Sequence, residues 1–310
     1  MKKKLLLCLA YIFLFTSISS LIACEEVEEP AFVAQNGIIT GLTEYGRTLT
    51  ELTVPDSIDG VDVIGFRDDL FYSIVRDEFG NSNVYKFTSI KITDNITTIP
   101  QGVFYGTTTL ESVKLPKNLT IIGDRAFYYC KNLKSVEIPN TVTDIGNYAF
   151  SNCGFTSIKI PSSMTFIKAG TFFECENLTS VEIPSSVNTI GYSVFSGCES
   201  LALIDIPSSV TTIKGGAFNK CTSLTSVVIP DGVTSIELGT FTNCTSLTSV
   251  TFGSGIISIS ENCFLNCNAL KNVNYKGTIN DWNKIEKGNW YALSSIETVT
   301  CIDGVIELTK

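Results

Sequence analysis

Apolar and polar residues follow a pattern that returns every 23 residues through the middle of the chain. Each unit contains a short alternating segment such as Val136-Glu137-Ile138-Pro139, then a second apolar pair such as Val142 and Ile145. Period-two alternation predicts a strand, which the proline ends. The period is marked by a phenylalanine, separated by 23 residues except for one step of 22, at Phe104, Phe127, Phe150, Phe172, Phe195, Phe218, Phe241 and Phe264.

One such unit is too small to fold alone. Burying its five or six apolar side chains contributes roughly 10 to 15 kcal/mol, whereas ordering the unit costs roughly 1.5 kcal/mol per residue. Stacked units cover each other's open faces and hydrogen-bond their strands into a parallel sheet. The pattern therefore predicts a β-rich repeat solenoid.

The repeat motif is specific, as in the unit from Leu178 to Cys198, which reads LTSVEIPSSVNTIGYSVFSGC. It resembles the BspA-like leucine-rich repeat family of bacterial and protist surface proteins, over residues 86–276. The resemblance implies a right-handed leucine-rich-repeat solenoid with a concave parallel sheet. It also implies exposure on the cell surface, adhesion to host matrix proteins or other cells, and no catalytic residues.

Segments on both sides of the array depart from the repeat. Residues 37–87 are predicted to form a degenerate N-terminal repeat or cap, with a tight turn at Asp59-Gly60, Phe71 in the repeat position, and an insertion near residues 76–85. The regular array spans 88–276. Residues 277–310 are predicted to form a C-terminal cap, with a short helix that Thr278 caps and a final hairpin at 301–305.

The N-terminus has the features of an export signal. Three lysines and an apolar run precede Cys24, and the segment Leu21-Ile22-Ala23-Cys24 resembles the lipobox of bacterial lipoproteins. Residues 1–23 would then be a lipoprotein signal peptide, Cys24 the lipidation site, and residues 24–36 an acidic tether that resembles a surface-export stretch. The expected location is the cell envelope, lipid-anchored, at the outer-membrane surface or outside the cell. A plain signal peptide, an uncleaved anchor and a simple spacer remain alternatives.

Charge limits the classes of partner. The formal net charge is −9 and becomes −12 if the signal lysines are removed, which argues against nucleic acid and anionic lipid headgroups. Membrane contact is expected only through the lipid anchor. Histidine is absent, so no imidazole is present to ligate metal or act as a general base. No cofactor and no metal site are expected.

Seven cysteines follow the repeat phenylalanines by three residues, and Thr107 takes this position in the first unit. We interpret them as buried free thiols, with some disulfides or a metal site as alternatives. The phenylalanine column is interpreted as core rather than as a stacking platform for sugars. Trp282 and Trp290 are expected to pack the cap onto the last repeat, with ligand contact as the alternative.

Outward positions of the strands form the candidate binding surface, because alternate residues of a strand point to opposite faces. One column consists largely of serines, from Ser89 to Ser249, and also contains Leu203. The other runs from charged to uncharged residues. The candidate binding residues are Lys91, Lys114, Glu137, Lys159, Glu182, Leu203, Asp205, Val228, Thr251 and Asn274.

These observations favour a binding protein of the cell surface, with adhesion as its leading role. The expected partner is a host matrix protein, a cell-surface protein or a glycan. A passive spacer is one alternative. An enzyme built on a β-helix, such as a polysaccharide lyase, is another, but such an enzyme needs clustered carboxylates, and Glu182 and Asp205 are isolated among serines.

Overall fold

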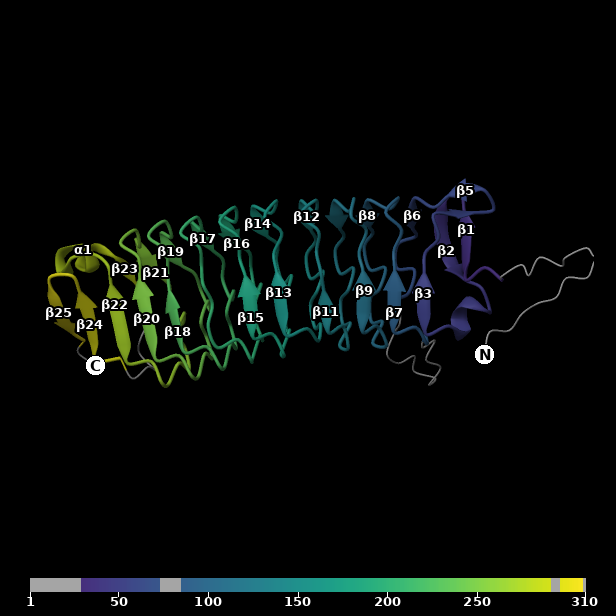
Figure 1. Ribbon diagram of the computed structural model, residues 1–310. Coiled ribbons are helices and arrows are strands. Elements are labelled where there is room, and N and C mark those ends of the chain that lie inside the picture. Colours follow the sequence, from purple (N-terminus) through teal and green to yellow (C-terminus); the bar gives the residue numbers. More distant parts are fainter. Residues whose placement is uncertain (1–28, 73–84, 291–295, 309–310) are drawn as a thin grey trace, which may run out of the picture.

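A computed structural model describes residues 29–72, 85–290 and 296–308. The chain forms a parallel-sheet β-solenoid of about 11 turns, with coils stacked along one axis (Figure 1). The predicted signal peptide and the predicted lipidation site, Cys24, lie outside the described residues. Among the residues that are described, no helix has the length and apolar character needed to cross a bilayer.

The first sheet contains the alternating segments and is the long row of arrows in Figure 1. Its strands pair in parallel with matching positions of successive coils. They are β3 (Glu51–Thr53), β7 (Ser89–Lys91), β9 (Ser112–Lys114), β11 (Ser135–Val136), β13 (Ser157–Lys159), β15 (Ser180–Glu182), β18 (Ser226–Val228), β20 (Ser249–Phe252), β22 (Asn272–Tyr275) and β24 (Thr298–Cys301).

The second sheet is formed by the second apolar segment of each coil and runs along another side of the solenoid (Figure 1). Its parallel strands are two residues long. They are β8 (Thr98–Ile99), β10 (Ile121–Ile122), β12 (Asp144–Ile145), β14 (Phe166–Ile167), β16 (Thr189–Ile190), β17 (Thr212–Ile213), β19 (Ser235–Ile236), β21 (Ser258–Ile259) and β23 (Glu286–Lys287). In the first coil, β6 (Gly65–Phe66) pairs in parallel with β2 (Ile38–Leu42) instead.

Hydrogen bonding divides the first sheet into three sections: β3 to β11, β13 with β15, and β18 onward. The first break falls at the coil of 22 residues, where Phe155 follows Cys153 by two residues instead of three. The second falls at Leu203–Asp205, which form no strand. The sequence pattern predicted one continuous sheet, so both breaks are departures from it.

The core is a ladder of aromatic rings and thiols. Neighbouring repeat phenylalanines, from Phe71 to Phe264, lie with ring centroids 5.0–6.1 Å apart and planes within 20° of parallel. They are fully buried or nearly so. The interpretation of this column as core is therefore confirmed.

The N-terminal end closes the solenoid with a hairpin. Strand β1 (Phe32–Gln35) pairs antiparallel with β2 (Ile38–Leu42) through a turn at Asn36-Gly37, where both residues have positive φ. The hairpin thus includes residues 32–36, which the sequence analysis assigned to the tether. A single 3-10 turn, η1 (Gly46–Thr48), follows, and β4 (Ser57–Ile58) pairs with β5 (Val61–Asp62) through the expected turn at Asp59-Gly60. Most of the expected insertion, namely its residues 76–84, lies outside the described residues.

The C-terminal cap agrees with its prediction. Thr278 caps the helix α1 (Ile279–Lys284) by accepting a hydrogen bond from the Asp281 backbone, and β24 forms an antiparallel hairpin with β25 (Gly304–Glu307). Trp282 and Trp290 are both only 2% exposed. Trp290 packs edge-on against Phe264, the last ring of the ladder, with ring centroids 6.0 Å apart. The cap therefore covers the open end of the core.

Candidate functional site

The predicted binding residues lie along the first sheet, mostly with exposed side chains. Eight are exposed, and Thr251 and Asn274 are half-buried. Seven of the ten belong to strands that place them opposite a neighbour: Lys91 opposite Lys114, Lys159 opposite Glu182, and Thr251 opposite both Val228 and Asn274. Glu137, Leu203 and Asp205 lie at the two breaks and have no strand partner.

The charges on this face are only partly compensated. Lys159 and Glu182 form an ion pair of 2.6 Å between Nζ and Oε1. Lys91 and Lys114 are like charges on directly opposed positions, and neither forms an ion pair with any described residue. Opposed like charges destabilise a sheet, so this lysine pair gains from the approach of an anionic group.

A hollow of about 730 Å³ opens on this face beside the first break. Lys114 and Glu137 line it together with Pro139 and Asn140. It combines two cations, Lys114 and Lys117, with one anion and the apolar side chains Val113 and Leu115. Such a mixture of charge and apolar surface suits a protein partner better than a purely polar ligand.

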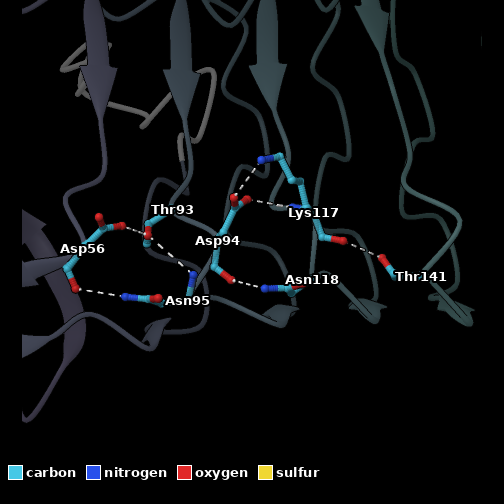
Figure 2. A network of polar contacts seen from close by, with 7 residues as sticks. All are labelled: Asp56, Thr93, Asp94, Asn95, Lys117, Asn118 and Thr141. Atoms are coloured by element: carbon cyan, nitrogen blue, oxygen red, sulfur yellow. Dashed lines mark hydrogen bonds and ion pairs between the residues drawn. The ribbon is translucent and has the colours of Figure 1, made fainter.

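The rim of this hollow is held by a ladder of polar contacts between coils (Figure 2). The Asp94 carboxylate accepts a 2.8 Å hydrogen bond from the Lys117 backbone and forms a 3.5 Å ion pair with Lys117 Nζ. The hydrogen bond from the Lys117 backbone lowers the pKa of Asp94. Asn118 donates to the Asp94 carbonyl and Thr141 to the Lys117 carbonyl, so the turns that flank the hollow are tied to one another.

The same ladder extends toward the N-terminal end in Figure 2, where Asn95 donates to the Asp56 carbonyl at 3.2 Å and Thr93 donates to the Asp56 carboxylate. These bonds link the degenerate first repeat to the regular array. The hollow therefore lies next to a rigid part of the surface.

The cysteine column is buried and unoxidised, as the sequence analysis expected. All nine cysteines in the described part of the chain are free and buried. Each repeat thiol donates to the carbonyl of the phenylalanine one coil earlier, for example Cys221 Sγ to Phe195 O at 3.1 Å. Thr107 makes the same contact to Phe71 O at 3.3 Å. No group of three His, Cys, Asp or Glu side chains in the described ranges could hold a metal ion.

Burial changes the chemistry of these thiols. Desolvation raises the pKa of Cys175 to about 12 and raises the pKa of the Cys198 thiol well above its ordinary value. A thiol must ionise to act as a nucleophile or metal ligand. The arrangement therefore favours a packing role for the cysteine column over a nucleophilic or metal-binding one.

A second surface feature was missed by the sequence analysis. A hollow of about 500 Å³, which we name the tyrosine groove, is lined by Asp69, Tyr72, Gln101, Gly102, Tyr105, Arg125, Tyr128, Tyr148 and Phe173. Tyr72, Tyr105 and Tyr128 stack on one another with ring centroids 4.7 Å apart at both steps. Tyr72 is 42% exposed, and the other two are partly buried.

A sequence signal for this groove exists. Each of the three tyrosines immediately follows a repeat phenylalanine, so stacking of the coils places them in one outward column. The signal is weak because Phe71 and Phe104 are 33 residues apart, which hides the alignment of Tyr72 with the other two.

Comparison with known proteins places the fold among bacterial repeat proteins. No curated protein matches the chain. The solved structure of a T. pallidum leucine-rich repeat protein is 28% identical with a TM-score of 0.53, and the match covers 60% of this chain and 82% of that one. A leucine-rich repeat protein from Bacteroides ovatus is 22% identical with a TM-score of 0.54, and covers 87% and 88%.

A leucine-rich cell surface protein from Faecalibacterium prausnitzii is 24% identical, with a TM-score of 0.45 and coverage of 82% and 95%. The family model for the BspA type leucine-rich repeat region matches in six copies over residues 72–202 and 211–310. These matched ranges cover well over half of the chain, so it belongs to the BspA type leucine-rich repeat family.

Proposed function

We propose that this protein is displayed on the cell surface through a lipid on Cys24 and acts in adhesion by binding a protein partner along its first sheet. Family membership and fold are consistent with a surface or binding role. The observation that carries the proposal is the opposed pair Lys91 and Lys114, neither of which forms an ion pair with a described residue, beside the hollow that contains Glu137.

The extent of this face fits a protein rather than a small ligand. From Lys91 to Val228 the candidate residues span six coil steps, which corresponds to roughly 30 Å at the spacing of neighbouring strands. A stable protein interface covers about 800 Å² per partner, and this length is sufficient for such an area. Leu203 and Val228, 63% and 51% exposed, add apolar contact surface next to the charged part.

Binding is tested first by screening the protein from residue 31 onward against immobilised host matrix proteins, cell-surface proteins and glycans. The double variant Lys91→Glu/Lys114→Glu then locates the site. We expect the double variant to weaken binding of the captured partner by about tenfold or more, since the anionic surface of the partner would then face two glutamates in place of two lysines. The control Lys220→Glu/Lys276→Glu makes the same change in net charge at exposed lysines outside the candidate surface, and should bind normally.

Two outcomes would count against this function. If no protein in the screen binds, a passive spacer becomes the better account. If a partner binds equally well to the double variant and the control, the interface lies elsewhere on the molecule.

The lipid anchor is tested separately. The variant Cys24→Ala should be released from the membrane fraction and should no longer incorporate labelled fatty acid, because lipidation of such proteins occurs on the cysteine thiol. Retention of the label in that variant would contradict the assignment of Cys24.

A further inference from the structure

We propose that the tyrosine groove is a second binding site, for a linear acidic oligosaccharide whose carboxylate lies against Arg125. The groove is separate from the first sheet, since none of its lining residues belongs to the strands of that sheet. It goes beyond the proposed adhesion function, because its ligand class and its location are both different.

The shape of the groove favours a linear ligand. Its lining residues occur at corresponding positions of five successive coils, those of Phe71, Phe104, Phe127, Phe150 and Phe172. Five coils at the spacing of neighbouring strands give a length of roughly 20 Å along the solenoid axis. A chain of several sugar rings has this form.

The aromatic column supplies ring surface for the apolar face of a sugar. Ser151 occupies the position that tyrosine holds in the preceding coils, and Phe173 holds it in the next coil. The column is therefore interrupted at Ser151, which is fully buried, and the aromatic surface at this position of the groove comes from Tyr72, Tyr105, Tyr128 and Phe173.

The structure keeps one wall of the groove in place. Ser151 is fully buried, and its hydroxyl donates to the Phe173 carbonyl at 3.0 Å. Tyr148 has its ring over Gly170, where a Cβ atom would lie only 2.2 Å from that ring, and meets Phe173 edge-on at 6.2 Å between centroids. Glycine is thus required at 170 for this wall of the groove.

The polar groups identify the ligand as a sugar rather than an apolar side chain of a peptide. Tyr105, Asp69 and Gln101 present hydrogen-bonding groups along the groove, and partial burial raises the pKa of Tyr105, so this phenol remains a donor. An apolar occupant would bury these groups without partners, whereas a polyhydroxylated one satisfies them.

Arg125 gives the preference for an acidic sugar. Its side chain is exposed and forms no ion pair with any described residue. A guanidinium binds a carboxylate through two parallel hydrogen bonds, which a neutral sugar does not offer. Asp69, in the first coil of the groove, can accept hydrogen bonds from hydroxyl groups of the same chain.

The test is calorimetric titration of the protein with tetrasaccharides that contain glucuronate, galacturonate or sialate, and with their neutral counterparts. We expect at least one acidic tetrasaccharide to bind, and Tyr105→Ser/Tyr128→Ser to weaken this binding by about tenfold or more. The double variant should fold, because the array itself has Ser196 and Thr242 at this position. Tyr192→Ser, an exposed tyrosine that does not line the groove, is the matched control and should bind normally.

The variant Arg125→Gly removes the guanidinium while keeping the three stacked tyrosines of the groove. Glycine is chosen because the backbone at 125 has φ of 54°, which glycine adopts readily. We expect about tenfold weaker binding of the acidic sugar and unchanged binding of any neutral one. Binding of no tetrasaccharide, or equal binding to the double tyrosine variant, would overturn the site. Equal affinity for acidic and neutral forms would overturn the role of Arg125. Lys91→Glu/Lys114→Glu should leave sugar binding intact, so the two proposals fail independently.

Discussion

At the residue scale, each coil of the array repeats one thiol in one environment. Cys244 and Cys267 are buried like the others, and their thiols donate to phenylalanine carbonyls at 3.1 and 3.0 Å. Because Thr107 makes the same contact, the position selects a small side chain with one polar donor rather than sulfur chemistry.

This environment predicts that the nine described thiols are unreactive in the folded protein. At pH 8 we expect a disulfide reagent such as DTNB to label them only at the rate of unfolding, because they are buried and out of reach of the reagent. Full labelling in guanidinium chloride is the control. Rapid labelling of the array cysteines without denaturant would show that the column is accessible.

The same burial predicts loss of stability in alkali. A thiol whose folded pKa is raised stays protonated in the folded state, so its contribution is complete below the unfolded value of about 9. It is lost as pH rises from there toward the folded pKa, which is about 12 for Cys175. Urea unfolding midpoints should therefore fall above pH 9. Cys175→Thr should reduce this fall, and an identical pH profile in that variant would contradict the cause.

A positive backbone φ at one position of each coil is a second constraint at the residue scale. The residue two before each repeat phenylalanine has positive φ, as at Gly216 and Asn262. Asparagine tolerates this region and β-branched residues do not. We expect Gly216→Asn to lose less than about 1 kcal/mol of unfolding free energy, and Gly216→Val to lose about 1–3 kcal/mol. Urea denaturation measures both, and equal stability of the two variants would contradict the constraint.

At the scale of the strand, the break at Leu203–Asp205 has a measurable consequence. None of the backbone N–H groups of residues 203–206 donates a backbone hydrogen bond in the structure, whereas Ile229 in the next coil donates to Thr251 at 2.8 Å. We expect the amides of Ile204 and Asp205 to exchange with deuterium faster than those of Ile160 and Ile229, which donate to Glu182 and Thr251 of the next coil. Uniform protection across these coils would mean that the sheet is continuous.

Much of this element order follows from the sequence. The period of the phenylalanines and the alternating segments predicted the stacked strands, and Thr278 with Asp281 predicted the short helix. Neither sheet break was predicted, because strand pairing depends on the coil-to-coil hydrogen bonds and not on apolar spacing alone. The tyrosine groove was missed since its column exists only after stacking brings Tyr72 to Tyr105 across an insertion.

At the scale of the whole molecule, the solenoid has two ends and each requires a cover. The phenylalanine ladder begins against Phe87, which meets Phe71 edge-on at 5.2 Å between centroids, and ends against Trp290. The hairpin β24–β25 also ends the first sheet with an antiparallel strand. Since each coil contacts mainly its neighbours, loss of a cover exposes core directly.

The cap therefore governs both stability and solubility, and a single buried tryptophan tests it. Trp290→Ala removes a ring that packs against Phe252, Phe264 and Trp282. We expect a loss of about 3–5 kcal/mol in unfolding free energy, the range for deleting a large aromatic side chain from a core. The loss should come with faster aggregation, because an uncovered end of the array offers rings and a strand edge to a second molecule. Trp290→Phe retains much of the contact and should lose less. If Trp290→Ala unfolds at the wild-type urea concentration and remains monomeric in light scattering, the last coil is stable without this cover.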